Sequence, residues 1–72
     1  MTATELIKMI QDGNTTDEVI DGVIACCDPW ELWDEYDLND PDDNARLRND
    51  TLDAIINHPT QTIDFVRENF EN

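Results

Sequence analysis

The chain has 72 residues, of which 18 are acidic and four are basic, and its formal net charge at pH 7 is -14. This length allows one small domain, residues 1–72, whose core is near the lower size limit for folding without disulfides or metals. The charge argues against nucleic acid and anionic membranes as direct partners, because both would repel the chain. It favours a basic protein, cations or a high-salt environment.

The apolar residues and the cysteines limit the possible class of protein and its cellular compartment. Leu, Ile, Val and Phe together number 17, more than is expected of a disordered chain with this charge. No apolar run approaches the roughly 18 residues that cross a bilayer. Cys26 and Cys27 are adjacent, so an intrachain disulfide is not expected. Without an apolar signal segment, the cytoplasm is the expected compartment (the host cell's, if a phage encodes the chain), and Met1 suggests a complete chain.

Two capping patterns predict the first two helices. The sequence TATE at residues 2–5 has the spacing of a capping box, and Gly13 is a typical left-handed helix stop. The same spacing recurs in TTDE at residues 15–18 and predicts a second helix that runs to about Cys27. At helical periodicity the apolar side of the first helix comprises Ala3, Leu6, Ile7, Met9 and Ile10, and that of the second comprises Val19, Ile20, Val23, Ile24, Cys26 and Cys27.

An Asp-Pro pair predicts a third helix, from Pro29 to about Asp37. Asp28 is a good N-cap, and proline is favoured at the first helical position. One side of this helix carries Trp30, Leu32, Trp33 and Tyr36, and the other carries Glu31, Asp34 and Glu35. Because large aromatics bury much apolar surface, we expect the aromatic side to face the core.

A second Asp-Pro pair, at residues 40–41, predicts a fourth helix from Pro41 to about Asn57. Arg48 falls within its apolar stripe, so we expect its stem to be buried and its guanidinium to pair with a carboxylate. The residues expected to be buried on this helix are Ala45, Thr51, Leu52, Ile55 and Ile56.

Residues 57–59, Asn-His-Pro, end that helix, and Thr60 is the expected cap of a last one. This last helix should turn Ile63, Val66 and Phe70 inward and leave Phe65 exposed on another face. No strand or hairpin pattern interrupts the series. The predicted fold is therefore all-α, a small bundle of four to five short helices.

The most unusual stretch is residues 28–43, DPWELWDEYDLNDPDD, which we call the acidic segment. It holds eight acids and no basic residue, and no Lys, Arg or His lies between Lys8 and Arg46. Repulsion among so many like charges destabilises a small domain. Because of this cost, we expect the acids to serve a function. Carboxylates on one helical face lie about 5–6 Å apart, which is comparable to the spacing of phosphates along a nucleic-acid strand.

The predicted partner-binding acids come from the second helix and from the acidic segment. They are Asp17, Glu18, Asp21, Glu31, Asp34, Glu35, Asp37, Asp40, Asp42 and Asp43. Their role would be to pair with the Arg and Lys side chains that normally hold phosphates.

Metal sites and catalytic sites are less well supported. An EF-hand loop that began at Asp37 would have Pro41 at its fifth position and Arg48 at its twelfth, and it would lack the glycine. The spacing of Cys26, Cys27 and His58 matches no familiar zinc site, so we interpret the cysteines as core thiols. No catalytic motif is present, and so short a helical chain leaves little room for a pocket. The sequence predicts a binding protein without metal or cofactor, and not an enzyme.

In size, charge and lack of a catalytic signature, the chain resembles the phage-encoded DNA-mimic inhibitors, such as anti-restriction and anti-CRISPR proteins. The resemblance implies a small inhibitor that competes for the nucleic-acid site of a basic, nucleic-acid-handling protein. The chain is similar too to small acidic immunity proteins and antitoxins, which implies neutralisation of a basic toxin. Adaptation to high salt and an acidic metal-binding domain are the remaining alternatives, and the sequence leaves the oligomeric state open.

Overall fold

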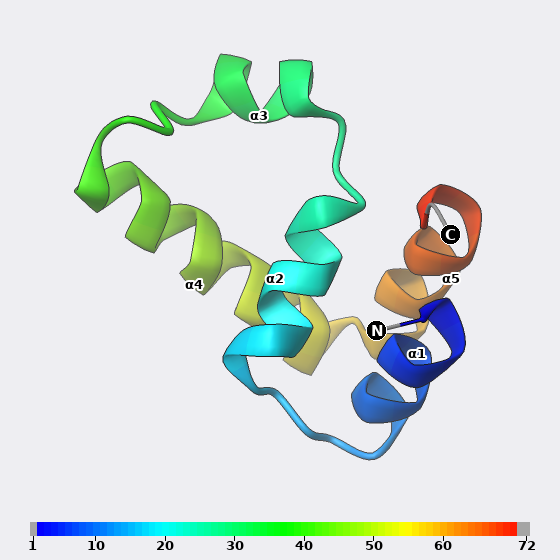
Figure 1. Ribbon diagram of the computed structural model, residues 1–72. Helices are drawn as coiled ribbons and strands as arrows, with labels where there is room; N and C mark the ends of the chain where they lie inside the picture. Colours follow the sequence, from blue (N-terminus) through cyan, green and yellow to red (C-terminus); the bar gives the residue numbers. More distant parts are fainter. Residues whose placement is uncertain (1, 71–72) are drawn as a thin grey trace.

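The computed structural model describes residues 2–70, except for the side chain of Pro29. Met1 lies outside this range. These residues form five helices and no strand (Figure 1). The helices are α1 (Ala3–Gln11), α2 (Asp17–Ala25), α3 (Pro29–Glu35), α4 (Pro41–Asn57) and α5 (Pro59–Asn69). The predicted all-α class is confirmed.

The start of α1 follows the sequence, whereas α2 starts one residue later than predicted. Thr2 Oγ1 accepts a hydrogen bond from Glu5 N at 3.2 Å, and Gly13 takes the expected left-handed backbone, with φ of 80°. In α2 the cap is Thr16 rather than the first threonine of the pair, and its Oγ1 accepts from Val19 N at 3.4 Å. This register places both acids that follow in the first turn, where the helix dipole favours them.

Both Asp-Pro pairs begin helices as predicted. Asp28 Oδ1 accepts from Trp30 N at 3.0 Å, and Asp40 Oδ1 accepts from Asp42 N at the same distance. Two helices end earlier than predicted, α2 at Ala25 and α3 at Glu35.

The predicted Thr60 cap is wrong. α5 begins at Pro59, and His58 is both the last cap of α4 and the first cap of α5, without a side-chain hydrogen bond. Because the chain turns within one residue, no space is left for a separate capping residue. Thr62 Oγ1 instead donates to the carbonyl oxygens of Ala54, at 3.2 Å, and His58, at 2.9 Å.

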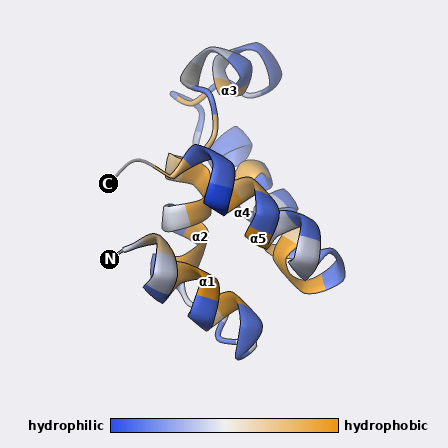
Figure 2. Cartoon of the chain, turned by 90° about the vertical axis from the view of Figure 1, so that its right-hand side faces the viewer, coloured by the Kyte–Doolittle hydropathy of each residue, from blue (hydrophilic) through white to orange (hydrophobic). Residues whose placement is uncertain are grey.

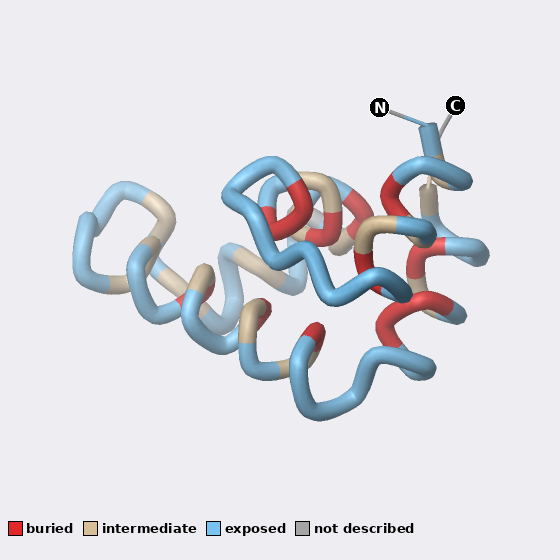
Figure 3. Tube along the Cα trace, turned by 90° about the horizontal axis from the view of Figure 1, so that it is seen from below, coloured by how far each residue is buried: buried red, intermediate tan, exposed pale blue. Residues whose placement is uncertain are grey.

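The core lies between α1, α2, α4 and α5, which pack as the pairs α1–α5, α2–α4, α4–α5 and α1–α2. Figures 2 and 3 show the hydrophobic and buried stretches of these helices turned toward one another. Gly22 allows α2 to approach α1 closely, because a Cβ there would lie 3.1 Å from the Leu6 methyl carbons. The main cluster is Leu6, Ile10, Val19, Ile20, Val23, Cys26, Ile55, Ile63 and Val66.

Some burial predictions for α4 and α5 are wrong. Ala45 and Ile56 are exposed, whereas Leu47, which the prediction omitted, is buried. Neighbouring residues on a helix point about 100° apart, and only the Ile55 side of α4 meets the other helices. Phe65, expected on an exposed face, is half-buried and packs against the core cluster.

The inward assignment of the α3 aromatics is also wrong. α3 stands apart from the four packed helices (Figure 1), and the exposed fractions of Trp30 and Trp33 are 79% and 50%. The four residues of the predicted aromatic side span an arc of roughly 160°, which is wider than one contact can cover. Only the Leu32 and Tyr36 edge of this arc is half-buried.

None of the helices in residues 2–70 combines the length and the apolar character that a bilayer crossing requires.

The contrast between core and α3 gives a stability prediction. Leu6 is fully buried, so Leu6→Ala should lower the free energy of unfolding by about 2–5 kcal/mol, a large part of the stability of so small a domain. Trp30→Ala should lower it by less than about 0.5 kcal/mol, because the indole is exposed. Urea unfolding followed by circular dichroism measures both; a large loss in the Trp30 variant would contradict its exposure.

Candidate functional site

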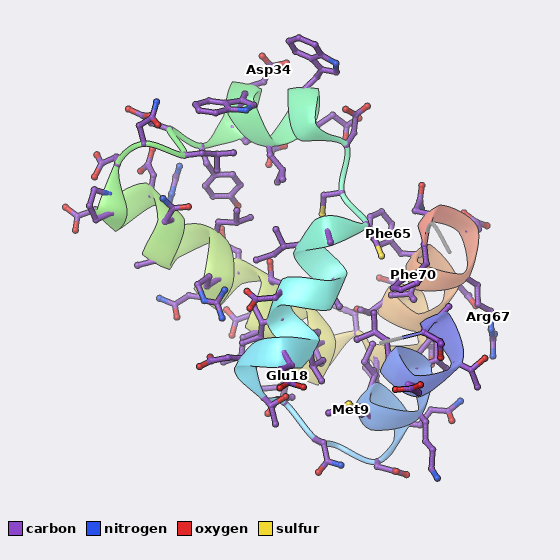
Figure 4. All side chains as sticks on the ribbon, viewed as in Figure 1. Met9, Glu18, Asp34, Phe65, Arg67 and Phe70 are labelled. Atoms are coloured by element: carbon purple, nitrogen blue, oxygen red, sulfur yellow. The ribbon has the colours of Figure 1, made fainter. Side chains whose placement is uncertain are left out.

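The ten predicted acids fall into two separate groups. Asp17, Glu18 and Asp21 lie toward the start of α2, whereas α3 follows the opposite end of that helix. Figure 4 shows Asp34 at the top of the view and Glu18 well separated from it in the lower half. Nine of the ten acids are exposed and Asp43 is half-buried, so all of them reach the surface without forming one continuous face.

Arg48 engages two of the three acids on α2. Its Nη2 lies 3.3 Å from Asp17 Oδ1, and its Nη1 donates to Asp21 Oδ1. Asp21 and, to a lesser extent, Asp17 raise the pKa of the Arg48 guanidinium. The predicted pairing of Arg48 with a carboxylate is therefore confirmed, and the pair connects α4 to α2. These two carboxylates have a structural use, which leaves Glu18 as the unpaired acid of this group.

Three other acids shape the connection between α3 and α4. Asp43 Oδ2 accepts from Asp37 N at 2.8 Å, and Asp37 Oδ1 accepts from Asn39 N at 3.1 Å. Asp40 caps α4 through the Asp42 amide. Asn44 Nδ2 adds a hydrogen bond of 2.6 Å to the Leu38 carbonyl oxygen. These carboxylates stabilise a turn that would otherwise leave backbone amides unpaired.

Arg46 fixes the end of α3 against α4. Its Nη2 donates to the Glu35 carbonyl oxygen at 3.0 Å and lies 3.8 Å from Asp43 Oδ1. Its guanidinium carbon lies 4.7 Å from the centre of the Tyr36 ring, which is the geometry of a cation–π contact. Sequence reasoning missed this cluster because Arg46 lies ten and eleven residues from Tyr36 and Glu35, and no helical spacing links it to them.

Tyr36 makes a second contact with α4. Its hydroxyl donates to Asp50 Oδ2 at 2.6 Å, and this hydrogen bond is the main reason why the pKa of Tyr36 is raised to about 12. Burial and the charge of Asp50 raise it further, whereas Arg46 lowers it. α3 is thus held mainly by polar contacts at its C-terminal end.

Five of the predicted acids make no side-chain hydrogen bond or ion pair with any residue of the described range. One is Glu18 on α2, and the other four belong to the acidic segment: Glu31, Asp34, Glu35 and Asp42. Among the predicted acids, the carboxylates available to a partner therefore lie mainly on α3 and the first turn of α4. Trp30 and Trp33 are exposed among them.

A groove of about 350 Å³ lies between α3 and the body of the fold. Its lining is largely apolar and comes from α2, α3, α4 and α5 and from residues next to these helices. The lining residues are Val23, Cys27, Leu32, Glu35, Tyr36, Leu47, Asp50, Thr51, Ala54, His58, Gln61, Thr62 and Phe65. This volume reaches the lower range of small-molecule sites, so the groove is larger than the sequence suggests.

Cys26 and Cys27 both donate hydrogen bonds to carbonyl oxygens and have raised pKa values. Cys26 Sγ donates to the Gly22 carbonyl oxygen at 3.3 Å, and Cys27 Sγ donates to that of Val23 at 3.6 Å. Burial raises the pKa of both thiols, and the charges of Cys26, Glu31 and Glu35 raise that of Cys27 further. A raised pKa reduces the thiolate fraction that nucleophilic chemistry and metal binding need. In residues 2–70 no group of three His, Cys, Asp or Glu side chains is arranged to hold a metal ion.

Comparison of the chain with family models, with curated proteins and with solved structures finds no match.

The Tyr36–Asp50 hydrogen bond gives a pH prediction. The chain has one tyrosine, so ultraviolet difference absorbance reports its ionisation directly. Because folding raises this pKa from 10.0 to about 12, the stabilising effect is fully present below pH 10 and is lost as the pH rises through about 12. Asp50→Asn should return the titration midpoint toward 10.0. A midpoint that is the same in both proteins would show that Asp50 does not raise the pKa of Tyr36, which would contradict this hydrogen bond.

Proposed function

We propose that this chain is a binding protein that inhibits a basic, nucleic-acid-handling protein by occupying its nucleic-acid site. The proposal is of the DNA-mimic type, with a phage anti-defence role such as anti-CRISPR or anti-restriction activity, in the cytoplasm of the host cell. The partner's Arg and Lys side chains would pair with carboxylates in place of phosphates.

The observation that carries the proposal is the uneven use of the acids. Arg48 and Arg46 engage three carboxylates, and Asp37 and Asp40 bond to nearby backbone amides. Four acids of the acidic segment keep their carboxylates free of such contacts: Glu31, Asp34, Glu35 and Asp42. Unpaired charges on one exposed segment create a local negative potential, which accelerates and orients the approach of a basic partner.

The exposed tryptophans favour recognition over solubility. Acids that only keep a protein soluble at high salt need no aromatic residues among them, whereas Trp30 and Trp33 stand exposed beside Glu31 and Asp34. Neutralisation of a basic toxin would use the same surface. The two functions differ in one respect, because only a nucleic-acid mimic must be displaced by the partner's own nucleic acid.

The experiment begins with capture of the partner from the native host on the immobilised chain, followed by elution with a salt step. The eluted protein is then tested for inhibition and for competition with its labelled DNA or RNA. Binding should weaken steeply with salt and exclude the nucleic acid. Simultaneous binding of both ligands, with the affinity for the partner unchanged, would contradict mimicry and favour a toxin-neutralising function.

Charge removal locates the surface. Glu31→Gln with Asp34→Asn removes two charges from α3, and the matched control, Glu5→Gln with Glu68→Gln, removes two from α1 and α5. All four side chains are exposed, so each substitution should change the free energy of unfolding by less than about 0.5 kcal/mol. We expect the first pair to weaken inhibition by at least about 10-fold, which is about 1.4 kcal/mol of binding energy, and the control pair to have little effect. Equal losses from both pairs would instead indicate diffuse attraction by net charge.

A further inference from the structure

The outer face of α3 combines indole rings with carboxylates. Trp30 and Trp33 are three residues apart and therefore project from the same side of the helix. At about 100° per residue, Asp34 follows Trp30 around the helix and Glu31 follows Asp34. Leu32, by contrast, lines the groove on the inner side.

These indoles have no structural role that explains them. Trp30 is 79% exposed and Trp33 is 50% exposed, whereas the apolar core of the described range lies elsewhere. Large exposed apolar side chains that share one face are typical of contact surfaces. Tryptophan is also strongly enriched among the residues that contribute most to binding energy at interfaces.

The charges beside the indoles determine what can cover them. A second copy of the chain would bring Glu31, Asp34 and Glu35 against the same residues of its neighbour. An anionic membrane would be repelled in the same way. A basic protein surface is complementary, and α3 carries no cation that would compete with it.

The chain itself shows how this kind of surface holds an arginine. The Arg46 guanidinium lies over the Tyr36 ring at 4.7 Å from its centre, with an Asp43 oxygen 3.8 Å from Nη2. Aromatic ring and carboxylate thus act on one planar cation. Tryptophan is the strongest aromatic partner for such contacts, and arginine stacks on aromatic rings more readily than lysine does.

We infer that the outer face of α3 binds arginine side chains of the partner, with guanidinium groups stacked on Trp30 and Trp33 and paired with Asp34 and Glu31. The inference rests on the proposed function and deepens it, because it specifies arginine-rich surfaces as the class of partner. Stacking would make the contact selective for planar guanidinium groups, whereas carboxylates alone do not provide this selectivity.

Two synthetic peptides of equal length, one alternating Arg and Gly and the other alternating Lys and Gly, test this preference. Each carries a fluorophore, and anisotropy measures its affinity for the full chain. The native chain should prefer the arginine peptide by about 5- to 10-fold. Trp30→Ala with Trp33→Ala should reduce this preference to less than about 2-fold, because the remaining attraction depends on charge alone.

Ile56→Ala is the matched control, because it removes an apolar side chain that is 58% exposed on α4. It should leave the preference for arginine intact. Circular dichroism verifies that each variant is folded, and the single Trp30→Ala variant, which alters the more exposed indole, should lose part of the preference if the double variant fails to fold. An unchanged preference in a folded tryptophan variant overturns the inference, as does an equal loss in the Ile56 variant.

Sedimentation of the native chain and the double variant tests whether a second copy of the chain covers this face instead. Self-association that depends on the two tryptophans, together with equal peptide affinities, would assign the face to a second copy and overturn the inference. The proposed function fails by a different result, namely that the native chain does not compete with the partner's nucleic acid. If the native chain competes with the nucleic acid but binds the arginine and lysine peptides equally, this inference alone is overturned.

Discussion

The scarcity of cations is the constraint on which this structure depends. Four basic residues share the chain with 18 acids, and the three arginines all contact carboxylates of the same chain. Arg48 connects α4 to the start of α2, and Arg46 connects α4 to the end of α3. Because α4 carries both, it is the helix that holds the acid-rich parts of the chain together against their mutual repulsion.

The small core explains why α3 depends on such contacts. Four helices bury Leu6, Val19 and Val66 completely, and this core lies away from α3. α3 therefore relies on the cation–π contact of Tyr36 with Arg46 and on the hydrogen bond from Tyr36 to Asp50. Polar contacts at a surface contribute less stability than apolar burial does, so α3 is held less firmly than the four packed helices.

The acids of this chain fall into those that support the fold and those that are available for binding. A carboxylate that caps a helix or pairs with an arginine supports the fold, and its removal would alter both folding and binding. Glu31 and Asp34 have no such partner in the described range and stand beside the exposed tryptophans. A protein can therefore carry a strongly anionic surface and still present a specific one, since only part of its charge is free to meet another molecule.

The sequence by itself determined the local structure. Thr2, Asp28 and Asp40 each cap a helix as their side chains predict, because capping depends only on residues within one turn. The periodicity of residues 19–26 also predicts the apolar side of α2, and this side is buried. The pairing of Arg48 with a carboxylate could also be anticipated, because a charge within an apolar stripe needs a partner.

Only the tertiary structure decided which apolar faces are covered. The sequence predicts that Trp30 and Leu47 both lie in helices, but Trp30 is exposed and Leu47 is buried. Burial depends on where the other helices lie. The Arg46, Tyr36 and Asp50 cluster joins two helices across a turn, and no spacing in the sequence encodes that meeting. The sequence therefore fixes how many acids the surface has, whereas long-range packing decides which of them support the fold and which remain free.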